Sequence, residues 1–291
     1  MVNGWGVVCL MILIIGIDGL LGNYLFKELK NFYSVLGTSR NLVGKNICNY
    51  DILNPISSLQ IEWEKVEFVI IAAASSNVGF CELEPNLSNE VNFIAPINII
   101  KELKKKNIPV IIFSSEYVFN GKNGKYSEQS QKSPNTNYGL QKSKLEDFLI
   151  HFYEKTIIFR ISKIASLRHQ KSFFYKMMDE MVTNEIYSAA TDQFFTPINI
   201  EDCGKIILKA IKAEEYGLFN LCGVQNFSRY SLALALKTNL KIKTKINKCS
   251  ILDINLTYDV PPDLTMTCEK LNNIFKFMPG KLNFVKNKFK F

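Results

Sequence analysis

An apolar run that ends in a series of glycines most constrains the fold of this chain. Val7 to Ile15 is apolar throughout, and it is followed by Gly16-Ile17-Asp18-Gly19-Leu20-Leu21-Gly22. The run is about half as long as the ~20 residues that a membrane-spanning helix needs. No Lys or Arg precedes it, whereas a secretory signal peptide would carry basic residues there. The pattern predicts a buried strand that leads through a turn into a helix, with residues 1–10 as an upstream extension.

The spacing of these glycines is typical of a dinucleotide-binding turn. One glycine permits the tight turn, one lets a diphosphate approach the backbone, and one allows close packing of helix on sheet. The free N–H groups at the start of the helix then face the phosphates. A plain strand–helix turn is the alternative. The predicted cofactor-binding residues of this turn are Gly16, Asp18, Gly19, Leu20, Leu21 and Gly22.

The end of the second predicted strand, Gly37-Thr38-Ser39-Arg40, bears on the choice of cofactor. An NAD-specific site normally carries an acidic residue about 20 residues after the glycines, where it binds ribose hydroxyls. This chain instead offers hydroxyls and a guanidinium, which suit a 2′-phosphate. Ser39 and Arg40 therefore predict that NADPH is preferred over NADH. An exposed arginine in a loop is the alternative interpretation.

Short apolar runs alternate with amphipathic stretches through the first half of the chain. Near-continuous apolar strands separated by helices are the signature of a parallel sheet covered on both faces. The predicted strands are 12–15, 33–37, 68–73, 110–113 and 156–159, and the predicted helical stretches are 20–29, 89–105 and 141–152. We expect an α/β fold, namely a Rossmann-type doubly wound parallel sheet with a smaller, interleaved C-terminal substrate lobe.

The strand–helix rhythm weakens after about residue 160, which suggests where the two units divide. Residues 1–160 are predicted to form an NAD(P)-binding Rossmann domain, completed by about 186–222, since 206–211 and 218–221 are further apolar segments. Residues 161–185 and 223–291 are predicted to form the substrate-binding lobe. The Gly-, Ser- and Pro-containing stretch 120–137 is the clearest loop.

Composition excludes several kinds of site. His151 and His169 are the only histidines, so a His-rich metal centre is impossible and no metal is expected. The seven cysteines are scattered without a CxxC pair, which predicts reduced thiols in a cytoplasmic protein. The net charge of +8 is mostly lysine, because only four of the 35 basic residues are arginines. Such a charge is more typical of a solvated surface than of a nucleic-acid interface, and we expect neither nucleic acid nor membrane as a partner.

Tyr138 and Lys142 are four residues apart at the start of a predicted helix, so they lie on one face. An adjacent ammonium favours the phenolate and brings the pKa of a tyrosine toward the working range of a general acid. Such a pair arises readily by chance in a chain with 12 tyrosines, and its place gives it meaning. Ser115 follows the strand 110–113, at the edge where parallel sheets bind ligands. We predict that Ser115 hydrogen-bonds the same carbonyl oxygen that Tyr138 protonates.

The order of these motifs resembles the extended short-chain dehydrogenases/reductases, most closely the dTDP-4-dehydrorhamnose reductase family. The resemblance extends from Ile12 to about Phe275. It is carried by the glycine-rich turn, Asp51-Ile52, Ala72-Ala73-Ala74 with Ser76 and Val78, Glu82 to Pro85, Val91-Asn92, Ser114 to Phe119, Ser133-Pro134, Tyr138-Gly139 with Lys142, Phe159-Arg160, and Asp192-Gln193 with Pro197.

The resemblance implies a reductase. Hydride would pass from NAD(P)H to C4 of a nucleoside-diphosphate 4-keto-6-deoxyhexose, in polysaccharide or nucleotide-sugar biosynthesis. Ser115, Tyr138 and Lys142 would be the catalytic residues: the phenol protonates the developing alkoxide, the lysine holds the nicotinamide ribose, and the serine orients the keto oxygen.

The resemblance also implies binding residues around this centre. Asp51 and Ile52 would flank the adenine of the cofactor. The cofactor channel would be lined by Ala72, Ala73 and Ala74, together with Tyr138 and Lys142. The substrate side would be formed by Ser76, Val78, Ser115, Glu116 and Lys163.

Departures from the family pattern cluster on the substrate side. Lys163 stands where the family usually has a Trp, Val78-Gly79 replaces a Val-Asp, and Val260-Pro261 replaces an Arg-Pro. We therefore expect an intact ketoreductase core with an altered sugar or nucleotide pocket. That expectation would be wrong if the protein reduced dTDP-4-dehydrorhamnose as readily as other members of the family.

Two other functions remain open at this point. One is a non-catalytic NADP-binding regulatory subunit, as with the β subunit of methionine adenosyltransferase. The other is a sugar-nucleotide epimerase or dehydratase with tightly held NAD, although the missing acid near Arg40 counts against it. The expected partner is a nucleoside-diphosphate sugar, and a homodimer is conceivable.

Overall fold

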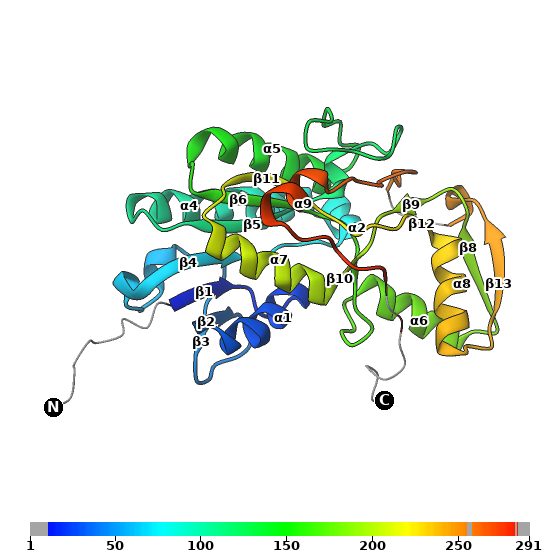
Figure 1. Cartoon of the computed structure of the whole chain (residues 1–291), viewed down its shortest axis with the longest axis horizontal. Coiled ribbons are helices and arrows are strands. Elements are labelled where there is room, and N and C mark those ends of the chain that lie inside the picture. Colours follow the sequence, from blue (N-terminus) through cyan, green and yellow to red (C-terminus); the bar gives the residue numbers. More distant parts are fainter. Residues whose placement is uncertain (1–10, 255–257, 283, 285–291) are drawn as a thin grey trace.

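The computed structural model describes residues 11–254, 258–282 and 284, so the predicted upstream extension lies outside the described residues. Its centre is a seven-stranded parallel sheet with the spatial order β11-β6-β5-β4-β1-β2-β3 (Figure 1). These strands are β1 (Met11–Ile15), β2 (Ser34–Ser39), β3 (Ile47–Asn49), β4 (Val66–Ile71), β5 (Val110–Ser115), β6 (Thr156–Ile161) and β11 (Gly217–Leu221). The chain leaves β1 toward β2 on one side and returns to β4 on the other. This arrangement confirms the predicted α/β Rossmann-type sheet.

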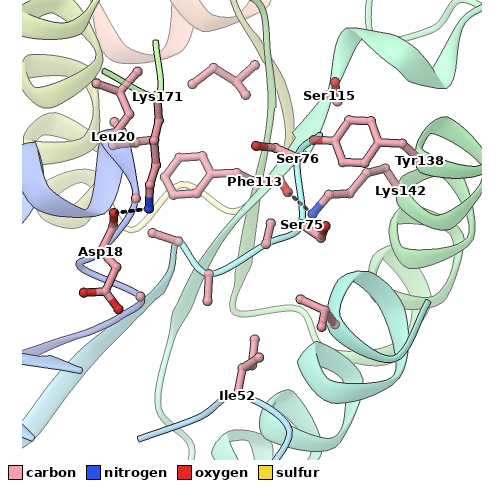
Figure 2. A pocket seen from close by; sticks show the side chains of 18 of the residues that line it. Asp18, Leu20, Ile52, Ser75, Ser76, Phe113, Ser115, Tyr138, Lys142 and Lys171 are labelled. Carbon is pink, nitrogen blue, oxygen red and sulfur yellow. Dashed lines mark hydrogen bonds between the residues drawn. The ribbon is translucent and has the colours of Figure 1, made fainter. Parts of the chain in front are cut away.

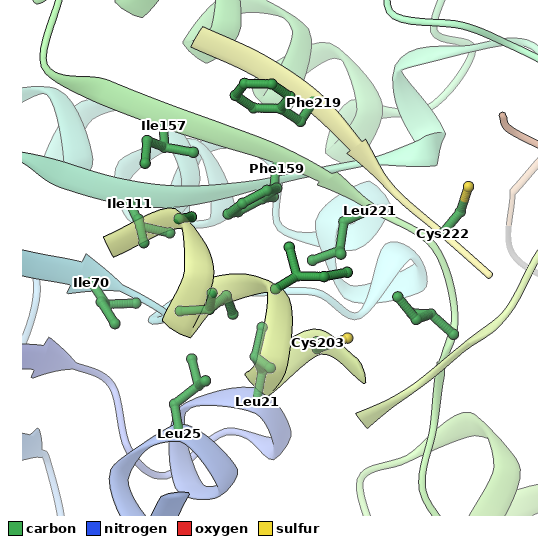
Figure 3. Close-up of a cluster of buried hydrophobic side chains, with 14 of the residues drawn as sticks. Leu21, Leu25, Ile70, Ile111, Ile157, Phe159, Cys203, Phe219, Leu221 and Cys222 are labelled. Carbon is green, nitrogen blue, oxygen red and sulfur yellow. The ribbon is translucent and has the colours of Figure 1, made fainter. Parts of the chain in front are cut away.

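Helices cover both faces of the sheet, because alternate strand residues point in opposite directions. Ile12 and Ile14 of β1 join a cluster with helices α1, α7 and α9, whereas Leu13 and Ile15 join a second cluster with α4 and α5. Figure 3 shows part of the first cluster. The helices are α1 (Leu20–Glu28), α2 (Val78–Leu83), α3 (Pro85–Asn89), α4 (Ala95–Lys105), α5 (Asn137–Phe152), α7 (Ile200–Ala213) and α9 (Glu269–Phe275).

A smaller lobe lies beside the carboxyl ends of the strands (Figure 1). Its core packs helices α6 (Phe173–Thr183) and α8 (Arg229–Leu240) against β8 (Ile186–Ala190), which pairs in parallel with β13 (Lys245–Cys249). Two short pairs join the lobe to the large sheet. They are β7 (Ile164–Ala165) with β10 (Ile198–Asn199), and β9 (Phe194–Phe195) with β12 (Phe227–Ser228).

The strand pairing refines the predicted division of the chain. The sequence interpretation grouped 186–222 with the first unit, and β11 does join the large sheet there. In contrast, β8 pairs with β13 in the lobe, and α9 covers the large sheet although it follows the lobe in sequence. The apolar segment 206–211 lies within α7, and residues 119–136 contain no helix or strand. Within the described residues, no helix is long and apolar enough to cross a membrane.

Candidate active site

One cavity of about 670 Å³ brings the predicted site residues together. It lies where the carboxyl ends of β1, β2, β4, β5 and β6 face the lobe, the usual place for ligands in such folds (Figure 2). Every predicted cofactor, catalytic and substrate residue lines this cavity except Gly22. The lobe adds residues that the sequence interpretation did not single out, namely Lys171 and Ser172.

The glycine-rich turn has the close packing that a phosphate-binding loop needs. Gly16 has a φ of +93°, a conformation that favours glycine. A Cβ on Gly22 would lie 2.2 Å from the Gly16 carbonyl oxygen, so Gly22 brings helix α1 close to the strand without lining the cavity. Gly19 caps α1 without a side-chain hydrogen bond, and the first turn of α1 carries no acidic residue. The N-terminus of α1 therefore suits an anionic group.

Asp18 joins this turn to the end of β2. Its carboxylate accepts hydrogen bonds from the Ser39 hydroxyl at 2.7 Å and from the Arg40 backbone N–H at 3.1 Å. A carboxylate thus lies beside the end of β2, although the sequence of that strand contains none. Periodicity could not have revealed this contact, because it depends on two loops meeting in space. The Arg40 side chain is exposed at the rim of the same cavity.

The floor of the cavity is held by backbone and amide hydrogen bonds. The N–H groups of Ala72 and Ala73 both donate to the Ile15 carbonyl at 2.9 Å. Beyond them, Asn92 accepts from the Ser75 N–H at 2.8 Å and donates to the Ser75 carbonyl at 2.9 Å. Asn92 is fully buried and lies in a π-helical stretch, Glu90–Ile94, of a kind that often marks functional sites.

Asn92 is a positioning residue that the sequence interpretation quoted only as part of a motif. Its amide also donates to the Gln141 side chain at 2.8 Å, and Gln141 donates to the Ser88 hydroxyl at 2.8 Å. This buried chain of hydrogen bonds connects the loop after β4 with the helix that carries Tyr138 and Lys142. The available signal was an Asn that interrupts the apolar run from Val91 to Ile97.

Ser115 and Tyr138 are held at the centre of the cavity. Ser115 ends β5, and Tyr138 lies in the first turn of α5, where its hydroxyl hydrogen-bonds the Ser115 side chain. Helix α5 starts there because Thr136 caps the Gly139 N–H at 3.1 Å and Glu82 accepts from the Asn137 N–H at 2.7 Å. These contacts place the phenol beside the serine.

Burial, and not Lys142, dominates the pKa of the tyrosine. Loss of solvent raises the pKa of Tyr138 to about 12, while the Ser115 hydrogen bond and the charge of Lys163 act in the lowering direction. The Lys142 ammonium donates to the Phe113 carbonyl at 3.0 Å and lies 6.0 Å from the centre of the Tyr138 ring. Burial lowers the pKa of Lys142 to about 8. The expectation that Lys142 lowers the pKa of Tyr138 is therefore wrong for this geometry, because β5 holds the ammonium away from the phenol.

A buried acid and a lysine form the substrate side of the cavity. Glu116 is almost completely buried, and that burial raises the pKa of its carboxyl. The Ser162 hydroxyl donates to Glu116, and the Lys163 ammonium lies 3.5 Å from it. Lys163 also lies 4.7 Å from the centre of the Tyr117 ring. Of these residues, Lys163 stands where the family pattern would place a Trp.

The arrangement combines a turn that suits an anion with a protonated phenol and three lysines, Lys142, Lys163 and Lys171, in one cavity. A phenol with a raised pKa stays protonated near neutral pH and can donate to an oxygen on which negative charge develops. The open turn and the uncapped helix start fit the diphosphate of a dinucleotide. No cluster of three or more metal-ligating side chains occurs among the described residues.

Comparisons with known proteins agree with this geometry. A sequence model described as the RmlD substrate binding domain matches residues 10–283. The dTDP-4-dehydrorhamnose reductase of Aggregatibacter actinomycetemcomitans is 27% identical over 259 residues, 86% of either chain. The methionine adenosyltransferase 2 subunit beta of Xenopus tropicalis is 30% identical over 151 residues, 51% of this chain and 45% of that protein.

Solved structures show the same fold. A dTDP-4-dehydrorhamnose reductase from Clostridium acetobutylicum superposes with a TM-score of 0.82 at 24% identity, covering 91% of this chain and 92% of that one. The dTDP-4-dehydrorhamnose reductase from Bacillus anthracis in complex with NADP gives 0.82 at 23% identity, covering 90% and 92%. Because the family model spans nearly the whole chain, this protein belongs to the RmlD substrate binding domain family, within the extended short-chain dehydrogenases/reductases.

Proposed function

We propose that this protein is an NAD(P)H-dependent reductase of the C4 keto group of a nucleoside-diphosphate 4-keto-6-deoxyhexose. The observation that carries the proposal is the convergence of Ser115, Tyr138 and Lys142 in the cavity that also contains the open N-terminus of α1. The sugar-nucleotide class comes from the relatives, which include dTDP-4-dehydrorhamnose reductases and the spore coat polysaccharide biosynthesis protein SpsK of Bacillus subtilis.

Each of these three residues has a separate role in the reduction of a carbonyl group. The cofactor, when bound, supplies a hydride to the keto carbon. Tyr138 gives its proton to the keto oxygen, so that the carbonyl becomes an alcohol and the tyrosine becomes a phenolate. Ser115 fixes the same oxygen by a hydrogen bond, and the Lys142 ammonium holds the nicotinamide ribose.

The preference for NADPH over NADH depends on Arg40. Asp18 already uses the Ser39 hydroxyl and the Arg40 N–H, which leaves the exposed guanidinium as the group for a 2′-phosphate. We expect Arg40→Ala to weaken NADPH binding by about 10-fold or more and NADH binding by much less, since a charge-assisted hydrogen bond contributes ~1.5–3 kcal/mol. Titration of the fluorescence of both reduced cofactors measures this, and an equal effect on both would contradict the assignment.

The sugar pocket is proposed to differ from that of the dTDP-4-dehydrorhamnose reductases. Lys163 stands where the family pattern has a Trp, and its ammonium lies 3.5 Å from the buried carboxyl of Glu116 in the same cavity. Such a pocket favours polar substituents on the sugar, because ammonium and carboxyl groups must be hydrogen-bonded when buried. Efficient reduction of dTDP-4-dehydrorhamnose would argue against this part of the proposal.

A panel of dTDP-, UDP- and GDP-linked 4-keto sugars, assayed with NADPH and NADH, tests the function directly. Consumption of the reduced cofactor with at least one of these sugars is the expected result. Cofactor binding without turnover on any of them would favour a non-catalytic subunit, the alternative suggested by the match to methionine adenosyltransferase 2 subunit beta. Oxidised NAD that copurifies with the protein would favour an epimerase or dehydratase.

A further inference from the structure

Lys171 reaches from the lobe across the cavity to the glycine-rich turn. It lies just before helix α6, where the almost fully buried Ser172 accepts a hydrogen bond from the Phe174 N–H at 3.2 Å. The Lys171 ammonium donates to the carbonyl oxygen of Asp18 at 3.1 Å, a contact between residues 153 positions apart. Figure 2 shows this side chain extended toward Asp18, beside Leu20 at the start of α1. This hydrogen bond holds the long, flexible side chain of Lys171 against the glycine-rich turn.

The charge of Lys171 is not neutralised by this contact. Within the described part of the chain, its ammonium forms no ion pair with a carboxylate, and the Asp18 carboxylate is turned to Ser39 and Arg40 instead. An ammonium has three donors, and a single carbonyl uses one of them. The neighbouring groups His169 and Lys27 are not acidic. The lysine therefore offers charge and donors to an anion in the cavity.

The start of α1 offers positive potential to the same place. Its N-cap residue is Gly19, no side chain caps its N–H groups, and its first turn lacks an acid. Asp18 immediately precedes this N-cap, so the ammonium of Lys171 lies next to the positive end of the helix dipole. Two positive groups in such proximity repel each other unless an anion lies between them. The anion that belongs at a glycine-rich turn is a diphosphate.

We propose that Lys171 binds the diphosphate bridge of the nicotinamide dinucleotide, so that the substrate lobe contributes directly to the cofactor site. The inference rests on the cofactor use of the proposed function. It adds to the cofactor site a binding residue that lies outside residues 1–160. It also gives the lobe a role before substrate arrives. A bound dinucleotide would bridge the loop before α6 and the turn between β1 and α1, on one side of the sugar pocket.

Lys171→Met tests the contact, and Lys176→Met is a matched control. Lys176 lies on α6, is exposed, and does not line the cavity. Dissociation constants for NADPH and NADH are measured by fluorescence titration at low and physiological salt. We expect Lys171→Met to weaken both cofactors about 10-fold or more, as the loss of a charge-assisted hydrogen bond predicts. We expect Lys171→Arg to retain most of the affinity and Lys176→Met to bind as the wild type does.

Each outcome decides the matter. A loss confined to NADPH would overturn the proposal, because it would assign Lys171 to the 2′-phosphate. Unchanged binding by Lys171→Met, or an equal loss in Lys176→Met, would overturn it as well while leaving the reductase proposal intact. A wild-type protein that binds neither cofactor would contradict the proposed function and this inference together. The melting temperature without cofactor checks folding, and we expect that of Lys171→Met to match the wild type.

Discussion

Tyr138 is the residue that we propose gives its proton to the keto oxygen of the substrate. Burial raises its pKa to about 12, and Ser115 supplies its hydrogen bond. We expect Tyr138→Phe to lower kcat by about 10²–10⁴-fold, the range of a general acid. Binding of the reduced cofactor should be unchanged, because the ring remains. Steady-state kinetics and fluorescence titration measure the two effects, and a fully active variant would remove the tyrosine from consideration.

Lys142 should set the alkaline limit of activity. Burial lowers its pKa to about 8, so the ammonium that we propose holds the nicotinamide ribose is lost as pH rises through that value. We therefore expect kcat/KM to fall above about pH 8. In Lys142→Arg the guanidinium stays charged, so activity should be lower but the decline near pH 8 should disappear. A decline that persists in this variant would assign it to another group.

The same shift has a consequence for stability with the opposite sign. Between about pH 8 and the ordinary lysine value of 10.5, the unfolded chain binds a proton at Lys142 that the folded chain has released. Folding stability from this group therefore rises with pH across that window, whereas activity falls.

The contact between β1 and α1 depends on Gly22. A Cβ there would lie 2.2 Å from the Gly16 carbonyl oxygen, and the backbone would have to shift. We expect Gly22→Ala to lower the free energy of unfolding by about 1–3 kcal/mol and to weaken cofactor binding. Gly44→Ala is the control, since nothing lies within 4 Å of its added Cβ. Urea denaturation compares the two variants, and equal stability would contradict the packing role of Gly22.

Single strands, helices and turns could be predicted from the sequence, whereas contacts between distant segments could not. The strand before Gly16 and the alternation of strands and helices are properties of neighbouring residues, and both are confirmed within the described residues, where that strand is Met11–Ile15. The Asp18 contact with Ser39, the Lys171 contact with Asp18 and the turning of Lys142 toward Phe113 join segments that are distant in sequence. The predicted lowering of the pKa of Tyr138 failed for that reason, because neither burial nor the direction of Lys142 is visible in a spacing of four residues.

The lobe was hardest to predict because its strands are short and its partners are remote. The β8 strand pairs with β13, more than fifty residues later, and neither has the long apolar run of a central strand. The chain also crosses repeatedly between lobe and sheet. Residues 263–267 are connected to residues 121–126 by backbone hydrogen bonds, one of which runs from the Tyr126 N–H to the Thr265 carbonyl at 2.9 Å.

These crossings lead us to expect that lobe and sheet unfold together. Leu264, Met266 and Phe275 belong to the large core cluster although they follow the lobe, so the core of the large sheet is complete only with residues from beyond the lobe. Trp5 and Trp63 are the only tryptophans, and Trp63 reports on the sheet. A second reporter for the lobe is Tyr230→Trp, in a chain with both native tryptophans replaced by Phe. We expect the urea midpoints of the two reporters to coincide. A lobe reporter that unfolds at lower urea would show instead that the crossings do not couple the two units.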